Sequence, residues 1–513
     1  MRLSLQALTT LPAGIQRPTY DPSKLGIGIV HLGLGAFHRA HEAVYTDDAI
    51  TANGGDWGIS AVSLKTPTAR DQLAPQDGLY SVRTVSRAGN AWRAELGATW
   101  RAESGDAWRV VGSVREVLFA PEQMAEVIAR IARAENKIIT LTVTEKGYCA
   151  NVNKREPLWD HADISHDLAH ADAPRSVLGV LAAGLHERFR AFGKPGGAPL
   201  TILCCDNLPE NGAVLESLVH QFITRLYPTM MPWLRDNVRF PSSMVDRIVP
   251  ASRAEDRTEA ARVLGVEDEG VVRAEPFSQW VIEDNFAAER PAWEQVGAQL
   301  VTDVRPFEKM KLRLLNGSHS LMAYLGYVAG YETIAETITD PAFERLVAAL
   351  MVEAEGTLEP IHGVDFAAYR TQLIERFGNP ANGHRCAQIA TDGSQKIPQR
   401  WISVASERLA RGLDVNALTL ATAGWIRYVY GKDEMDLAIT ISDPLAAEFA
   451  AVAAKHPYDA LSFADAILRI EPVFGTLGRN PAFSAPVKRW VSQLFRDGVQ
   501  ATVDSFSEAA AFR

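Results

Sequence analysis

Four short apolar runs, spaced widely along the first part of the chain, most constrain its fold. They are apolar almost throughout, so both faces of each strand must be covered, as in a parallel sheet flanked by crossover helices. Residues 79–87 and 91–114 interrupt this pattern and are expected to form antiparallel strands with loops. The four runs are GIGIVHL (26–32), WGISAVSL (57–64), KIITLTVT (137–144) and PLTILCC (199–205). We therefore predict an α/β fold with a mostly parallel sheet.

The later part of the chain changes from strand-like runs to helical periods. Two pairs there combine an N-cap residue with proline at the first helical position, namely Asp340-Pro341 and Asp443-Pro444. A chain of 513 residues also exceeds what one hydrophobic core usually supports. We predict an N-terminal Rossmann-like dinucleotide-binding domain in residues 1–302 and a mostly α-helical C-terminal domain in residues 303–513.

Composition and charge narrow the class of protein. Hydrophobic residues make up 47% of the chain and charged residues 22%, as in a folded globular protein. The net charge of -10 argues against a binder of nucleic acid or anionic membranes. No apolar run has spanning length, and the N-terminus lacks the basic and apolar regions of a signal peptide. We expect a cytoplasmic protein with neither nucleic acid nor membrane as partner.

Cysteine and histidine spacing gives little support for a metal centre. The four cysteines contain no CxxC pair, so neither structural zinc nor a disulfide framework is expected. His166 and His170 have helical metal-ligand spacing and lie close to His161 in the sequence. No nearby carboxylate pattern completes a catalytic zinc motif, so we expect chemistry without a metal.

The first apolar run leads into a glycine turn. A strand that ends in Gly33 and Gly35 and continues as a helix can present backbone N–H groups to a pyrophosphate. His38 stands where a third glycine is usual, and a tight turn without a ligand is the alternative interpretation. After the second run, Lys65 and Thr66 precede any acid that could bind the ribose hydroxyls. The choice between NAD(H) and NADP(H) therefore stays open.

The segment Lys311–Ser320, KLRLLNGSHS, places polar groups in an apolar setting. On a helix at 100° per residue, Lys311, Asn316 and His319 fall with Glu308 within an arc of about 140°. Burial disfavours an ammonium ion, so the pKa of a buried Lys311 is expected to fall toward neutrality. The neutral amine can then act as a general base. The alternative is a snorkelling lysine beside a helix-capping Asn316 and a core His319.

Several motifs in one order resemble the mannitol dehydrogenase family, the polyol-specific long-chain dehydrogenases. KLRLLNGSHS resembles the family's Lys-x4-Asn-x2-His signature, and HLGLGAFHRAH resembles its cofactor loop. The resemblance extends to LTVTEKGYC, CDNLPENG, SMVDRIVP and EPFSQWVIEDNF, and so covers nearly the whole chain. It implies hydride transfer between NAD(H) and a secondary alcohol or ketone, without a metal.

The resemblance implies a role for each catalytic residue. Lys311 is expected to take the proton of the hydroxyl as hydride leaves the same carbon, and to return it in reduction. Asn207 and Asn316 are expected to donate hydrogen bonds to the oxygen where negative charge develops. His319 is expected to hold and orient the substrate. For Asn207, an ordinary turn residue after a strand is the alternative.

Supporting roles follow from the same resemblance. Asp246 is expected to position the charged network, and Glu308 to link Lys311 to solvent for proton exchange. Structural ion pairs are the alternative for both acids. Glu145 is assigned to the cofactor side, where it could gate the proton route. The expected cofactor-binding residues are Gly33, Gly35, Ala36, Phe37, His38, Arg39 and Glu145.

Within the family, the motifs most resemble the fructuronate reductase, or D-mannonate oxidoreductase, branch. Members that act on mannitol tend to have glycine at the position of Lys146 and arginine at that of Gln388. Lys146 and Lys396 suit a substrate with a carboxylate, with a solvated loop charge as the alternative for Lys146. Lys146, Gln388 and Lys396 are therefore the expected substrate-binding residues. Residues 392–401 are read as a surface loop, with a wall of the substrate site as the alternative.

The preferred prediction is an NAD(H)-dependent interconversion of D-fructuronate and D-mannonate. The alternative is a mannitol 2-dehydrogenase, or related polyol dehydrogenase, that acts on D-mannitol and D-fructose. A third reading, a catalytically silent NAD-binding regulatory protein, is disfavoured by the intact residues of the signature. The expected partner is a small sugar acid or polyol, and the protein is expected to be a monomer or a weak oligomer.

Overall fold

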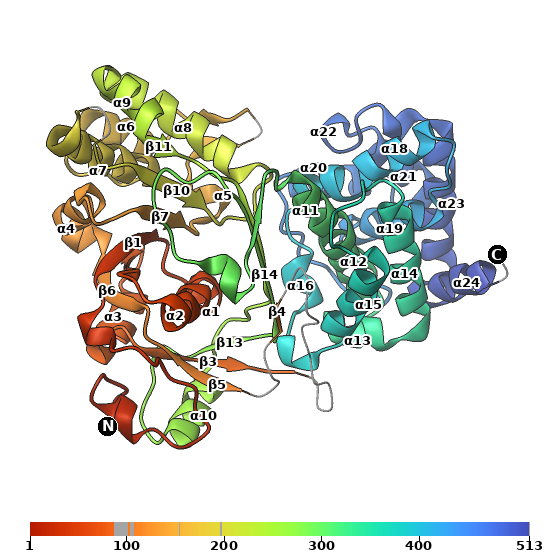
Figure 1. Cartoon of the computed structure of the whole chain (residues 1–513). Helices are drawn as coiled ribbons and strands as arrows, with labels where there is room; N and C mark the ends of the chain where they lie inside the picture. Colours follow the sequence, from red (N-terminus) through yellow and green to blue (C-terminus); the bar gives the residue numbers. More distant parts are fainter. Residues whose placement is uncertain (87–100, 103–106, 153, 195–196, 512–513) are drawn as a thin grey trace. The chain divides into compact units, whose positions relative to one another are not determined.

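The chain divides into two compact units in its computed structural model (Figure 1). The model describes residues 1–86, 101–102, 107–152, 154–194 and 197–511. Unit 1 spans Met1–Arg305 and unit 2 spans Pro306–Arg513. The sequence predicts the domain boundary after residue 302. Across the described residues, every helix is too short or too polar to span a bilayer.

A six-stranded sheet forms the centre of unit 1 (Figure 1). All five pairings are parallel, in the order β11-β10-β7-β1-β2-β6. This is the order of a doubly wound dinucleotide fold, in which ligands bind at the carboxyl ends of the strands. Each of the four predicted runs forms one strand, as predicted. The strands are β1 (Ile27–Leu32), β2 (Gly58–Ser63), β6 (Val114–Phe119), β7 (Ile138–Leu141), β10 (Leu200–Cys204) and β11 (Val238–Arg239).

Helices cover both faces of this sheet, which explains its apolar strands. Ile29 of β1 belongs to a core shared with α1 (Ala36–Ala40) and α2 (Glu42–Asn53). Val30 and Leu32 point to the opposite face, because side chains alternate along a strand. That face is covered by α4 (Ala120–Ala132), α7 (Val177–Phe192) and α8 (Asn211–Leu226). The other helices of unit 1 are α3 (Thr68–Leu73), α5 (Thr144–Gly147), α6 (Ala162–Ala169), α9 (Met231–Asn237) and α10 (Ala254–Leu264).

Smaller sheets complete unit 1. The predicted antiparallel excursion is confirmed where the structure describes it, because β3 (Tyr80–Thr84) pairs antiparallel with β5 (Trp108–Val111). The remainder of that stretch, residues 91–100 and 103–106, lies outside the described residues. The other strands are β4 (Arg101–Ala102), β8 (Ala150–Asn151), β9 (Glu156–Pro157), β12 (Ser243–Asp246), β13 (Val272–Ala274), β14 (Phe277–Glu283) and β15 (Gln299–Val301).

Unit 2 is built from helices, as predicted. Its core forms where α12, α14 and α19 pack on one another and α23 packs on α19. Two π-helices, Lys311–Asn316 and Pro398–Ile402, also pack together. The helices that follow unit 1 begin with α11 (Arg305–Met310), α12 (Gly317–Val328), α13 (Ile334–Thr339), α14 (Pro341–Glu355), α15 (Phe366–Phe377), α16 (Cys386–Ile389) and α17 (Gly393–Ile397). They continue with α18 (Ser403–Ala410), α19 (Asn416–Val429), α20 (Ala446–Lys455), α21 (Ala460–Leu468), α22 (Glu471–Phe474), α23 (Pro481–Asp497) and α24 (Val499–Ala511).

One of the two predicted helix starts is confirmed and the other is wrong. Helix α14 begins at Pro341, and the Asp340 carboxylate caps it by accepting backbone hydrogen bonds of the first turn. Helix α20 begins only at Ala446. The Asp443 carboxylate accepts a hydrogen bond from the Leu445 backbone N–H, at 2.9 Å, in the turn before this helix. It also accepts hydrogen bonds from the backbone N–H and hydroxyl of Ser394, at 2.8 and 2.6 Å. A tertiary contact therefore shares the side chain that the sequence assigns to a cap.

Candidate active site

The glycine turn after β1 has the shape of a dinucleotide cradle. Gly33 has φ +103°, and a Cβ atom there would lie 2.2 Å from the carbonyl oxygen of Thr142. Only glycine fits, because both the backbone angle and the close approach exclude a side chain. At Gly35, the N-cap of α1, a Cβ atom would approach only the Gly33 oxygen, at 3.8 Å. Its backbone is therefore open to a ligand, which fits the phosphates of NAD(H).

The residues after this turn mainly support its backbone through buried packing and hydrogen bonds. His38 is fully buried, and its ring stacks on His31 with centroids 3.4 Å apart. Burial holds the pKa of His38 well below its ordinary value and lowers that of His31 to about 3, so both rings are neutral. The Arg39 guanidinium donates to the carbonyls of Gly35, at 3.2 Å, and Gly270, at 2.5 Å. Ala36 and Phe37 open α1, and the Phe37 ring stacks on that of His41.

A hollow of about 400 Å³ lies at the carboxyl ends of β2 and β6. Lys65 lines it and forms an ion pair of 3.4 Å with Asp163 of α6. An acid thus reaches the end of β2 from a distant helix, although Lys65 and Thr66 precede the first acid after that strand in the sequence. The other lining residues are Leu64, Ala120, Pro121, Met124, His166, Ala173, Pro174, Arg175 and Val180.

The ends of β7 and β10 carry further predicted residues. Glu145 and Lys146 lie on α5, directly after β7, and both are exposed. Asn207, also exposed, follows β10. Between them, the buried Asp206 carboxylate accepts hydrogen bonds from the backbone N–H of Thr144, at 2.7 Å, and from the Tyr148 hydroxyl, at 2.6 Å. Asp206 therefore holds the segments after β7 and β10 together at the carboxyl ends of these strands.

Asp246 lies on a different sheet of unit 1, at the end of β12, and is buried. The Asn211 amide joins that strand to the end of β10. It donates to the carbonyl oxygens of Asp206, at 2.9 Å, and Ser243, at 2.8 Å. The hydroxyl of Ser243 in turn donates to the Cys204 carbonyl, at 2.7 Å. These hydrogen bonds hold β12 next to the carboxyl end of β10, which Asn207 follows.

In unit 2, the segment that begins with Lys311 is a π-helix, so the prediction of an ordinary helix is wrong there. Hydrogen bonds of a π-helix span five residues instead of four. Residues five apart, such as Lys311 and Asn316, therefore stack more closely than 100° per residue would place them. Lys311 is 9% exposed, Asn316 8% and His319 7%, and Glu308 on α11 is half-buried. The π-helix places these groups closer together than an α-helix would. Helices of this kind are frequent at functional sites.

His319 lies between aromatic rings in a buried setting. Its ring centroid is 4.6 Å from that of Phe377 and 5.6 Å from that of His384. The buried Nε2 atom has no hydrogen-bond partner among the described residues. A buried nitrogen without a partner is costly, so a ligand that bonds to it gains free energy.

The neighbouring groups with the largest effect on the pKa of His319 are basic residues. Its pKa lies well below the ordinary value, first because of burial and then because of His384, Arg400, Arg376 and Lys311. The pKa of His384 is itself lowered to about 4, by burial and by Arg376. The sequence did not single out His384 or Arg376, because neither lies near the signature in the chain. A neutral imidazole among cations favours an anionic ligand.

The predicted surface loop at residues 392–401 is wrong, because this stretch is helical. It contains α17 and most of the second π-helix. Lys396 on α17 is half-buried, and its Nζ donates to the Ile389 carbonyl and the Thr391 hydroxyl, both at 3.3 Å. Gln388 on α16 is exposed. The turn-like Asp-Gly pair misled the prediction, since Asp392 adopts a left-handed conformation directly before a helix.

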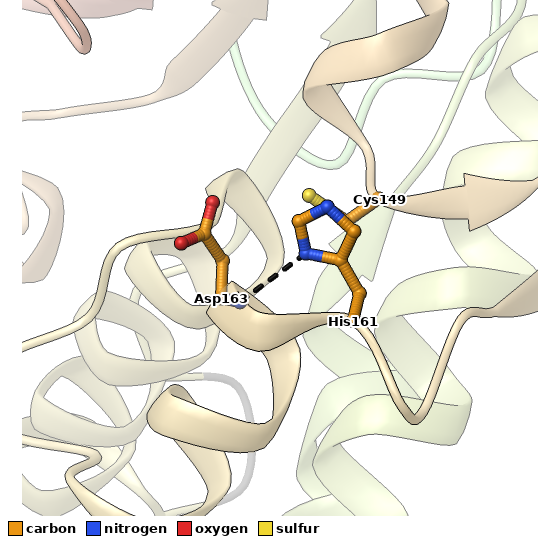
Figure 2. A group of neighbouring side chains, drawn as sticks. All are labelled: Cys149, His161 and Asp163. Atoms are coloured by element: carbon orange, nitrogen blue, oxygen red, sulfur yellow. Dashed lines mark hydrogen bonds between the residues drawn. The ribbon is translucent and has the colours of Figure 1, made fainter.

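A group of metal-binding residue types lies in unit 1 (Figure 2). One ligand atom each of Cys149, His161 and Asp163 lies within 4.8 Å of the others. His161 Nδ1 accepts a hydrogen bond of 3.2 Å from the Asp163 backbone N–H and so caps α6, which leaves the ring proton on Nε2. Burial raises the pKa of the Cys149 thiol, which disfavours the thiolate that a metal needs. Both features favour a capping role for this group.

The predicted site residues thus fall into two sets. Unit 1 holds the glycine turn, Glu145, Lys146, Asn207 and Asp246. Unit 2 holds the groups around the first π-helix, namely Glu308, Lys311, Asn316 and His319, with Gln388 and Lys396 on α16 and α17. Sequence reasoning missed Arg376, His384 and Arg400, since no local pattern connects them to the signature.

Both units match known families. Residues 27–295 match the family model for the mannitol dehydrogenase Rossmann domain, and residues 303–495 that for the mannitol dehydrogenase C-terminal domain. D-mannonate oxidoreductase of Escherichia coli (strain K12) is 42% identical over 95% of this chain and 97% of that protein. Mannitol 2-dehydrogenase of Phaeosphaeria nodorum is 37% identical over 96% of this chain and 83% of that protein.

A solved structure is similar along the whole chain. It is the ternary complex of Pseudomonas fluorescens mannitol 2-dehydrogenase with NAD and D-mannitol, at 35% identity and a TM-score of 0.84. The likeness covers 99% of this chain and 100% of that one. The predicted fold class and the predicted family are thereby confirmed. The chain belongs to the mannitol dehydrogenase family.

Proposed function

We propose that this protein interconverts D-fructuronate and D-mannonate, with NAD(H) as the hydride partner. The observation that carries the proposal is the basic surrounding of His319, where the guanidinium groups of Arg376 and Arg400 supply positive charge beside Lys311 and His384. Both sugar acids carry a carboxylate, whereas mannitol and fructose are neutral. Charge-assisted hydrogen bonds to a carboxylate are about twice as strong as neutral ones, so such a site favours the acids.

The general class of reaction follows from the family. Its members are NAD-dependent oxidoreductases that act on secondary alcohols, and this protein is one of them. The Escherichia coli relative at 42% identity is a D-mannonate oxidoreductase, which supports the choice of sugar acid. The complex of the Pseudomonas fluorescens relative contains NAD, and the open backbone at Gly35 suits the same cofactor.

Lys311 serves as the acid and base of this proposal. Bound NADH supplies hydride to the carbonyl carbon in reduction. Lys311 gives a proton to the carbonyl oxygen, and in oxidation it takes the proton of the hydroxyl. The π-helix stacks the Asn316 amide on the same side, where its N–H can donate to that oxygen. Glu308, one turn earlier, exchanges the proton with solvent.

The remaining predicted residues orient the reactants. The neutral His319 bonds to the substrate through its buried Nε2. Asn207 and Asp246 have the roles that the family resemblance implies, an amide donor and an acid that positions charged groups. Glu145 belongs to the cofactor side with Gly33, Gly35, Ala36, Phe37, His38 and Arg39. Lys146, Gln388 and Lys396 belong to the substrate side.

A mannitol 2-dehydrogenase is the second candidate, because relatives with that activity are 35% and 37% identical to this chain. A panel of substrates separates the two. We expect NADH oxidation with D-fructuronate to exceed that with D-fructose by more than about 100-fold in kcat/KM, because a neutral ketose cannot form charge-assisted hydrogen bonds with the basic groups. Equal or faster turnover of D-fructose contradicts the proposal. NADH binding without turnover of any substrate would indicate the regulatory protein instead.

A further inference from the structure

We infer that Arg400 is a positioning residue that fixes the π-helical backbone carrying Asn316. The inference rests on the proposed role of Asn316 in the reaction and adds a residue that acts through it. Arg400 lies in the second π-helix, Pro398–Ile402, 84 positions after Asn316 in the sequence.

The contacts converge on one junction of the backbone. At Asn316 and Gly317, the first π-helix ends and α12 begins. Arg400 Nη1 donates to the Asn316 carbonyl oxygen, at 3.1 Å, and to the Ser320 hydroxyl, at 2.7 Å. The next residue, Trp401, donates from its indole Nε1 to the Gly317 carbonyl oxygen, at 3.2 Å. Both carbonyls at the junction therefore accept a side-chain donor from the second π-helix.

A junction of this kind benefits from outside donors. The backbone hydrogen bonds change there from a span of five residues to a span of four, and π-helical segments are rare because they are less stable. A carbonyl oxygen can accept a second hydrogen bond, and a guanidinium is a charged donor with a fixed geometry. Arg400 thereby holds the junction in the π-to-α register. The direction of the Asn316 amide follows from that backbone.

The chemical consequence is a fixed position for one donor to the reacting oxygen. A displacement of a catalytic group by about 1 Å can cost about 100-fold in rate. Arg400 also contributes positive charge that lowers the pKa of His319. Two effects of Arg400 can therefore be separated: charge at the site changes KM for an acid, whereas the position of Asn316 changes the rate of the bond-making step.

The test compares Arg400→Gln and Arg400→Lys with Arg385→Gln, an exposed arginine of unit 2 that pairs with Glu332. Rates are measured at saturating substrate with NADH and with NADH deuterated at the transferred position. We expect Arg400→Gln to lower kcat by about 10- to 100-fold and to raise the deuterium isotope effect, because hydride transfer becomes slower than the other steps. Arg400→Lys should restore part of the rate, and Arg385→Gln should retain the normal rate.

Each contrary result has a distinct meaning. A raised KM for D-fructuronate with normal kcat and isotope effect overturns positioning and leaves Arg400 as a substrate-side charge. A lower rate with an unchanged isotope effect indicates fewer folded molecules, which also overturns it. Should Arg400→Gln fail to fold, Arg400→Lys decides, since wild-type kcat and isotope effect in that variant refute the inference. The series uses whichever substrate the wild type turns over, and a wild type silent with all of them refutes the proposed function.

Discussion

Lys311 and Asn316 stand at the two ends of one buried π-helix, five positions apart. A hydrogen-bond span of five residues stacks these two side chains. An amine and an amide on one side of a helix can both reach a single substrate oxygen. This relationship underlies the first prediction.

Replacement of Lys311 by alanine should remove the proton donor and acceptor. General acid–base catalysis contributes about 10²- to 10⁴-fold, so we expect kcat to fall by about 1,000-fold. The dissociation constant of NADH, measured by fluorescence titration, should change little. Lys309→Ala is the matched control, because Lys309 is two positions away and pairs with Glu407 at 3.7 Å. A near-normal rate for Lys311→Ala would falsify the assignment of the base.

The two glycines of the cofactor turn should respond differently to alanine. Gly33→Ala introduces a Cβ atom 2.2 Å from a carbonyl oxygen at φ +103°, so we expect a markedly lower melting temperature. Gly35→Ala meets no close atom and should fold normally, while NADH binds more weakly because the new methyl group faces the ligand. Melting temperatures and NADH titrations check both variants. A stable Gly33→Ala protein, or unchanged NADH affinity in Gly35→Ala, contradicts this account.

Lys146 should matter more for an acid than for a neutral sugar. Lys146→Gly removes an exposed charge next to the end of β7, so KM for D-fructuronate should rise by about 5- to 10-fold, and that for D-fructose should change little. Lys154→Gly, another exposed lysine of unit 1, serves as the control. Equal changes with both substrates would leave Lys146 as an ordinary surface charge.

Treatment with a chelator should leave the activity unchanged. The proposed proton transfer uses Lys311, and Nδ1 of His161 already accepts a hydrogen bond from the Asp163 backbone N–H. The rate is compared before and after prolonged dialysis against EDTA. Activity that disappears on dialysis and returns with zinc would mean that a metal takes part.

A buried acid in unit 1 should make stability depend on pH. Glu42 is 2% exposed, and burial, with a smaller effect of Asp206, raises its pKa to about 8. The unfolded chain releases this proton near pH 4.5, so the folded state binds more protons from about pH 4.5 to about pH 8. The free energy of unfolding therefore falls through this window as the pH rises, and the loss is complete above it.

Glu42→Gln removes this titration and tests the sign. Each unit of pKa shift corresponds to about 1.4 kcal/mol, so a few kcal/mol are at stake. The melting temperature of the variant relative to the wild type should rise from about pH 5 to about pH 9. Parallel curves for the two proteins would show that Glu42 keeps an ordinary pKa.

Local sequence determined the strands of unit 1 and predicted the candidate site residues. The runs at 26–32 and 199–205 had to become parallel strands because apolar side chains on both faces need cover on both sides. The positive φ of Gly33 is a local requirement of its turn, whereas the close approach to the Thr142 carbonyl comes from the residue directly after a neighbouring strand. The Lys-x4-Asn-x2-His spacing, through its resemblance to the family, predicts Lys311, Asn316 and His319 as site residues.

Tertiary structure decided how these residues act. The π-helix at Lys311–Asn316 was not predicted from the sequence, and the carbonyl oxygens at its end accept hydrogen bonds from a second π-helix far along the chain. The Asp443 carboxylate also binds Ser394, 49 positions earlier in the chain, and Asp163 of α6 reaches Lys65 after β2. Side-chain hydrogen bonds and charges act over a few ångströms in space regardless of sequence separation, so the basic surrounding of His319 exists only once Arg376, His384 and Arg400 have folded around it.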